Sequence, residues 1–421
     1  MNDTIAKIKE AFCNNDSAKV RDLLVAHPEL RSKINEPLAP FDSPAVVWAK
    51  SREMLDVLLD AGADINARSR WWAGGFGILD GASPELAEYA IQRGAVLDAH
   101  SAARLGRIDE LKRLIAANPA LVHARGGDGQ TPLHFASTVE IAEFLLNVGA
   151  NIDARDIDHE STPAQYMIKE RQAVARYLVS RGCVTDILMS SALGDLVRVQ
   201  QHLDADPNRI RMTVSNQYFP KQNPHSGGTI YIWTLGAHKS AHHVARDFGH
   251  AEVLRFLMKR SPDELKVAVA AEFGDETLVR QLLSEHPDLI QQLAAEDLGR
   301  IANAAQDSNL AAVRLMLRSG WPLDARGQHG ATPLHWAAFH GNLELTQLIL
   351  QNHPPLEATD KDFRGTPLGW AIHGSENGWR LPENNYAGTV EALLHAGAKL
   401  PEKAGGTPEV REVLSRHGLV P

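Results

Sequence analysis

Apolar side chains recur along this chain at spacings of three and four residues, in short runs that glycine and proline separate. The clearest pattern covers residues 329–353, where the apolar residues fall on one face of each of two predicted helices. Thr332 can cap the first helix, and Pro333 is tolerated in its first turn, where a backbone N–H would lack a partner. Gly341 permits the tight turn before the second helix. This helix pair cannot bury its own apolar faces, so we expect similar pairs to stack against it.

The same pattern returns through most of the chain. Residues 332–338 read TPLHWAA, and residues 131–136 and 366–371 read TPLHFA and TPLGWA. Two predicted helix ends read GADIN (62–66) and GANID (149–153), with glycine at the position that needs a left-handed backbone.

These motifs resemble the ankyrin-repeat family over nearly the whole chain. The resemblance implies an all-α solenoid of stacked helix–turn–helix units with projecting hairpin fingers. We expect one solenoid over residues 1–421, with a C-terminal cap at residues 401–421.

Three segments depart from the repeat. Residues 212–239 contain many turn formers followed by β-branched and aromatic residues, which predicts a β-hairpin inserted into a finger. Residues 375–388 form a predicted loop that lengthens the turn in the last full repeat. At residues 70–80 the expected signature is replaced by RWWAGGFGILD. Alignment on Gly94 places Gly77 at the position of Trp336 and Asp80 at that of Phe339.

Composition excludes several classes of function. The chain is 44% hydrophobic and 23% charged, with a formal net charge of −9 and only two cysteines. The negative charge argues against nucleic-acid binding, and no apolar run is long enough for a membrane span. We see no glycine-rich phosphate loop, nucleophile elbow or metal-ligand spacing, and therefore expect no metal or other cofactor. We expect a cytoplasmic monomer.

The resemblance also indicates where ligands would bind. In ankyrin repeats the signature residues, including His134, His243 and His335 here, build the stack, while fingers and inner helix faces contact partners. Six of the eight tryptophans fall at such positions or in the two insertions. Each could merely pack against a neighbouring finger, but together they suggest a binding groove. The predicted ligand-binding residues are Trp71, Trp72, Asp158, Tyr231, Trp233, His238, Lys239, Trp336, His340, Trp370, His373, Glu376 and Trp379.

Two functional hypotheses follow. In the first, a concave groove rich in Trp, His, Asp and Glu recognises a protein segment or a polar ligand. In the alternative, the protein is a cofactor-independent enzyme, a hydrolase or lyase acting on a small polar molecule in a roofed pocket. The enzyme hypothesis requires the two insertions to close a cavity in which at least two carboxyl or imidazole groups are within reach. Its acid/base candidates are Asp80, His159, Glu160 and Asp362.

Overall fold

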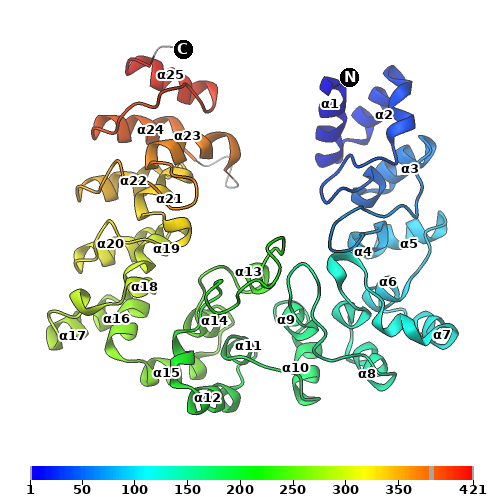
Figure 1. The fold of residues 1–421 in the computed structure, drawn as a ribbon, viewed down its shortest axis with the longest axis horizontal. Coiled ribbons are helices and arrows are strands. Elements are labelled where there is room, and N and C mark those ends of the chain that lie inside the picture. The colour runs from blue at the N-terminus through cyan, green and yellow to red at the C-terminus, as the bar shows by residue number, and fades with distance from the viewer. Residues whose placement is uncertain (1, 379–383, 420–421) are drawn as a thin grey trace. The chain divides into compact units, whose positions relative to one another are not determined.

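The computed structural model of the protein describes residues 2–378 and 384–419. Within these ranges the chain is helical and contains no β-strand, which confirms the predicted all-α repeat architecture. The chain divides into two compact units, Met1–Arg255 (unit 1) and Phe256–Pro421 (unit 2). Figure 1 labels the helices of both units along the chain. Each unit is described by itself.

Unit 1 is built from short helices that pair across tight turns. Side-chain caps define several of its helix starts: Asp16 accepts the Lys19 N–H (2.9 Å) and Asp195 accepts the Arg198 N–H (3.0 Å). Its α-helices are α1 (Asn2–Cys13), α2 (Ser17–Ala26), α3 (Arg52–Asp60), α4 (Ile78–Gly81), α5 (Pro84–Gln92), α6 (Ala99–Arg104), α7 (Ile108–Ala117), α8 (Val139–Asn147), α9 (Pro163–Met167), α10 (Gln172–Ser180), α11 (Ile187–Ala192), α12 (Leu196–Ala205), α13 (Tyr231–Thr234) and α14 (Ala241–Asp247). Its 3₁₀ helices are η1 (Pro28–Lys33), η2 (Ala45–Trp48), η3 (Pro119–His123), η4 (Gly127–Gly129), η5 (Pro132–Phe135) and η6 (Pro207–Arg211).

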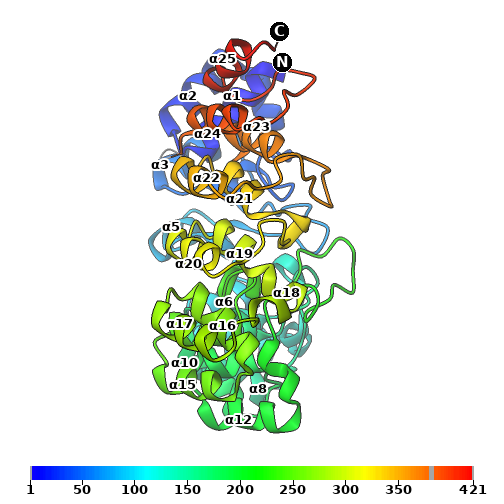
Figure 2. The same cartoon turned by 90° about the vertical axis from the view of Figure 1, so that its left-hand side faces the viewer.

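Helix α15 (Ala251–Arg260) leads from unit 1 into unit 2. Figure 2 shows the helices of unit 2 stacking in chain order, and one continuous apolar core joins α16 to α25. The α-helices are α16 (Asp263–Glu272), α17 (Glu276–Glu285), α18 (Ala295–Leu298), α19 (Arg300–Gln306), α20 (Leu310–Arg318), α21 (Pro333–Phe339), α22 (Leu343–Leu350), α23 (Pro367–Asn377), α24 (Tyr386–His395) and α25 (Pro408–Arg416), and the 3₁₀ helices are η7 (Ile290–Gln292) and η8 (Gln328–Gly330).

The signature histidines link neighbouring repeats. The His134 Nε2–H donates to the Ser161 carbonyl of the next repeat (3.1 Å), while Nδ1 accepts the Thr131 N–H. His335 makes the equivalent bonds to Gly365 and Thr332. Burial lowers the pKa of His134 to about 3, because a charged ring would lose its hydration. These rings are therefore neutral structural groups.

The predicted β-hairpin at residues 212–239 is wrong. This insertion is an irregular segment with a single helical turn, α13, and one isolated bridge between Thr213 and Ser240. The aromatic stretch winds into α13 because Tyr231 is fully buried and its hydroxyl donates to Asp186 (2.8 Å).

The other irregular segments differ from expectation in detail. Helix α23 continues to Asn377, into the predicted loop at 375–388, and residues 379–383 of that loop lie outside the described ranges. At residues 70–80 the predicted register is wrong. Gly77 is the N-cap of α4, and the Asp80 carboxylate accepts its N–H (2.7 Å). Asp80 is therefore equivalent to His335, the third residue of α21, and not to Phe339 as predicted. The register differs because α4 is shorter than α21 at its C-terminal end.

Candidate recognition site

Six aromatic rings meet on two adjacent repeats of unit 2. Trp336 of α21 and Trp370 of α23 stand at equivalent positions, with their ring centroids 5.1 Å apart and edge to face. Phe339 lies against Trp370 (5.8 Å) and near His373 (6.4 Å). The rings border a pocket of about 430 Å³. Its lining residues are His329, Trp336, Phe339, Phe363, Gly365, Gly369, Trp370 and His373.

One buried carboxylate shapes the wall of this pocket. Asp360 accepts the indole N–H of Trp370 (2.9 Å) and the backbone N–H groups of Phe363 (2.6 Å) and Gly365 (2.7 Å). Burial alone would raise the pKa of Asp360, but these hydrogen bonds outweigh it and hold the pKa below its ordinary value. The finger and the Trp370 ring are thus fixed before any ligand arrives.

The pocket also carries polar groups. His329 Nδ1 lies 2.8 Å from Asp362 Oδ2, and the Asp362 side chain is 49% exposed. Phe363, beside this pair, is 68% exposed. The indole N–H of Trp336 is buried and has no hydrogen-bond partner among the described residues. A buried donor without a partner is costly, so a ligand acceptor that reached it would be favoured.

In unit 1, the insertion is tied to the finger of residues 156–161. Glu160 accepts the backbone N–H groups of Gln222 (2.8 Å) and Asn223 (2.7 Å). The Asp158 carbonyl accepts the Ser226 hydroxyl, and its carboxylate accepts the Gly227 N–H (3.0 Å). Between finger and insertion lies a pocket of about 410 Å³, bordered by residues that include His159, Glu160 and Asp186.

A second aromatic group of unit 1 lies beside this finger. The Trp71 indole donates to Asp128 Oδ1 (3.0 Å), and Trp72, 41% exposed, lies beside His225 of the insertion. Burial and the Asp158 carboxylate raise the pKa of Asp128 to about 6, although His159 and the Trp71 bond oppose this. Asp128 is not among the residues that the sequence pattern predicts for a site. The sequence offers one signal for Asp128: it lies three residues before a TPLH signature, as His329 does in its own repeat.

The four predicted acid/base residues have different surroundings. Asp80 pairs with Arg68 (3.1 Å) as a helix cap in unit 1. His159 and Glu160 lie together beneath the insertion, but Glu160 is bound to backbone N–H groups. Asp362 belongs to unit 2 and pairs with His329.

The predicted ligand-binding residues divide in the same way. Trp336, Trp370 and His373 line the aromatic pocket of unit 2, and Trp71, Trp72 and Asp158 cluster near the insertion of unit 1. The structure places Tyr231 (0% exposed) and His340 (2%) in the packed interior, where His340 bonds to the Gln306 carbonyl. Trp233 is 69% exposed, and Glu376 is also exposed. His238 and Lys239 lie at the end of the insertion. Trp379 lies outside the described residues.

Comparison with known proteins identifies the family. The model for ankyrin repeats (3 copies) matches residues 99–188, 267–362 and 301–404, more than half of the chain. The protein therefore belongs to the ankyrin-repeat family, whose stacked units form extended surfaces for protein recognition. A similar stretch occurs in the palmitoyltransferase Hip14 of Drosophila melanogaster, 29% identical over 98 residues. That stretch is 23% of this chain and 14% of the relative, so the chain spans only a small part of it. Among the described residues, every helix is too short or too polar to cross a bilayer.

Proposed function

We propose that this protein recognises a segment of another protein, and that the aromatic pocket of unit 2 receives an apolar or aromatic side chain of that segment. The convergence of six rings from two fingers and two inner helices carries this proposal. Aromatic rings offer large contact areas with few rotatable bonds, and a buried anchor side chain supplies most of the affinity in many interfaces. Family membership favours a protein partner.

The polar groups of the pocket would orient the bound segment. A backbone carbonyl of the segment would satisfy the buried Trp336 indole N–H if the bound segment reached it, because no described residue accepts from this group. The exposed Asp362, paired with His329, would meet polar or basic groups outside the pocket. We therefore expect the anchor to be apolar and the flanking residues to include a lysine or arginine.

The enzyme alternative has weaker support. An acid or base needs a carboxyl or imidazole group that can reach a substrate proton. Asp80 and Glu160 are instead engaged with a helix N-terminus and with the insertion backbone. His159 and Glu160 do border a common pocket, and this keeps hydrolysis or elimination of a small polar molecule as the second hypothesis.

Phe363 offers a direct test of the recognition proposal. Short random peptides selected on the full-length protein should share an apolar or aromatic anchor. Phe363→Ala should weaken their binding by roughly tenfold or more, because about 1.5–3 kcal/mol of apolar burial is lost. Fluorescence or calorimetric titration of the selected peptides measures the change. Phe363 is 68% exposed, so its removal should leave the fold intact.

Trp233→Ala is the matched control, since Trp233 is equally exposed (69%) but belongs to the insertion of unit 1. Its peptide affinities should equal those of the unaltered protein. Peptides that bind Phe363→Ala as tightly as the unaltered protein, or that lose affinity only with Trp233→Ala, would refute the assignment to unit 2.

A further inference from the structure

Three potential metal ligands converge at the insertion of unit 1. His159 Nε2 lies 3.9 Å from Asp128 Oδ2 and 3.7 Å from Asp158 Oδ2, and all three atoms lie within 4.8 Å of one another. A tetrahedral cation with bonds of about 2.1 Å holds its ligand atoms about 3.4 Å apart. Small side-chain movements would therefore bring the three atoms onto one ion. The side chains are 15%, 9% and 12% exposed for Asp128, Asp158 and His159.

Each ligand is held in orientation through its other polar atom. The Trp71 indole N–H donates to Asp128 Oδ1 (3.0 Å), and the Gly227 N–H donates to Asp158 Oδ1 (3.0 Å). His159 Nδ1 lies 2.9 Å from the Gly228 carbonyl, which can only accept, so Nδ1 carries a proton. Nε2 is then the ring atom that faces the two carboxylate oxygens. One imidazole nitrogen and two carboxylate oxygens turned towards a common point suit a cation between them, and a backbone carbonyl on the far nitrogen is the usual support for a metal-bound histidine.

The equivalent fingers of unit 2 provide an internal comparison. His329 stands there at the position of Asp128, Asp362 at that of Asp158, and Phe363 at that of His159. His329 and Asp362 form a direct pair at 2.8 Å, so the unit 2 fingers need no additional ion. In unit 1 the same positions bring two carboxylates together with an imidazole. The fingertips of the two units share their backbone conformation at Asp128 and His329, so the difference between a direct pair and a potential metal site comes from the side chains.

We propose that Asp128, Asp158 and His159 bind a divalent transition-metal ion, with Zn²⁺ as the preferred ion. One imidazole and two carboxylates form a mixed nitrogen and oxygen set, which suits Zn²⁺ better than Mg²⁺ or Ca²⁺. Three protein ligands leave a coordination position for water or for a donor from a partner. The ion would join two fingers of unit 1 and, through Gly227 and Gly228, the insertion.

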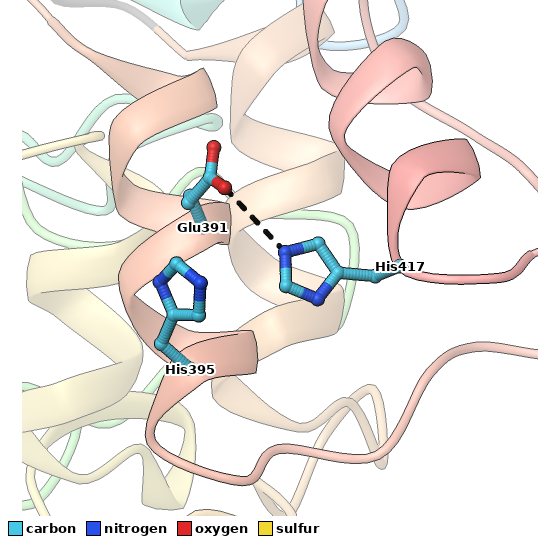
Figure 3. A group of neighbouring side chains, drawn as sticks. All are labelled: Glu391, His395 and His417. Carbon is cyan, nitrogen blue, oxygen red and sulfur yellow. Dashed lines mark ion pairs between the residues drawn. The ribbon is translucent and has the colours of Figure 1, made fainter.

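A second group of similar composition lies in unit 2, where Glu391 and His395 project from α24 towards His417 (Figure 3). The Glu391 carboxylate there lies 3.0 Å from the Arg416 guanidinium, with which it forms an ion pair, and 3.5 Å from His417 Nε2. The guanidinium already neutralises the carboxylate and would repel an incoming dication. This group is therefore the weaker candidate and serves as the internal control.

Zinc titration of the full-length, metal-free protein tests the proposal. We expect one tight equivalent of Zn²⁺ by calorimetry, with a change in tryptophan emission because Trp71 bonds to Asp128. Asp128→Asn and His159→Gln should each weaken this binding by roughly 100-fold and abolish the emission change. Mg²⁺ and Ca²⁺ should not compete. The double variant His395→Ala/His417→Ala should bind Zn²⁺ as the unaltered protein does.

The thermal unfolding midpoints of the metal-free proteins show whether a variant binds Zn²⁺ weakly because it lacks a ligand or because its fold is destabilised. Asp128→Asn removes one carboxylate from a group that also contains Asp156 and Asp158, so its metal-free midpoint should match or exceed that of the unaltered protein. The proposal fails if Asp128→Asn keeps the tight equivalent, or if the double variant loses it. It also fails if the unaltered protein binds Zn²⁺ only weakly and at many sites, as scattered surface histidines would.

Discussion

At His134 a titratable ring serves as a fixed hydrogen-bonding group. Its pKa of about 3 in the folded protein lies below the ordinary value near 6.5, so the unfolded chain binds a proton that the folded chain does not. Above about pH 6.5 the ring is neutral in both the folded and the unfolded chain, so the free energy of unfolding is not reduced by protonation of His134. It falls by about 1.4 kcal/mol per unit as the pH drops from there towards 3.

We therefore expect His134→Gln to be less stable at neutral pH but less sensitive to acid. Between about pH 7.5 and about pH 5, the unaltered protein should lose about 2 kcal/mol more than the variant. Urea unfolding at the two pH values measures this difference. Equal losses in both proteins would show that His134 does not account for the acid sensitivity.

Residue type alone did not separate buried structural groups from pocket-lining groups. His340 and His373 looked equivalent as ligand-orienting donors, yet His340 is 2% exposed and bonded to Gln306, whereas His373 borders the aromatic pocket. Asp80 looked like a groove acid but caps α4. The shortening of α4 decides the role of Asp80, and the Gln306 carbonyl in the preceding repeat decides the role of His340. A single sequence shows neither feature directly.

At the scale of elements, α21 and α23 approach closely at a glycine. A Cβ on Gly374 would lie 2.2 Å from the Phe339 carbonyl oxygen, so the two backbones touch beside the aromatic pocket. Gly369, earlier in α23, borders the same pocket, but a Cβ there would meet only the Thr366 hydroxyl at 3.6 Å. The two glycines thus have different roles within one helix.

Gly374→Ala should destabilise the protein by about 1–3 kcal/mol and weaken peptide binding, because it forces α21 and α23 apart. Gly369→Ala is the matched control and should be neutral or stabilising by up to about 1 kcal/mol, since alanine favours helix. Chemical unfolding and peptide titration of both variants measure these effects. If the two variants are equally stable, close helix contact is not what Gly374 provides.

The repeat elements could be predicted from the sequence because their signals are local. Thr332, Pro333 and Gly341 set the ends of α21 and the turn after it within a few residues. The conformation of the insertion could not be predicted, since Glu160 and Asp158 bind residues 222–227, more than sixty positions away. Tertiary contacts of this kind decide whether an aromatic stretch becomes a strand or a helical turn.

At the scale of the whole molecule, each repeat contacts mainly its neighbours, so disturbances should stay local. Unit 2 contains a buried ionic triad in which Arg300 pairs with Glu272 (2.6 Å) and Asp297 (3.1 Å). Burial would lower the pKa of Arg300, but the two carboxylates raise it above its ordinary value. The triad joins α16, α18 and α19, and no motif in the sequence marks its three residues.

Arg300→Met should cost about 3–5 kcal/mol, because it leaves two buried carboxylates without a cation. Hydrogen exchange should accelerate in α16, α18 and α19 and remain unchanged in α1 to α3 of unit 1. Arg280→Met, which removes the exposed pair with Glu276, is the control and should cost less than about 1 kcal/mol. Faster exchange throughout the chain would show that the molecule unfolds as one cooperative body.

The fingertips of the two units show how such a protein can acquire new chemistry. Asp128 and His329 occupy the same left-handed backbone position (φ 54° and 60°) ahead of equivalent helices. The side chain at the tip can therefore be exchanged while the stack beneath it stays the same. Transplanting aspartate and histidine to positions 329 and 363 should give unit 2 the ligand set of unit 1. Diversification in this fold can then begin with substitutions at the tips, while an insertion such as residues 212–239 supplies backbone groups that orient them.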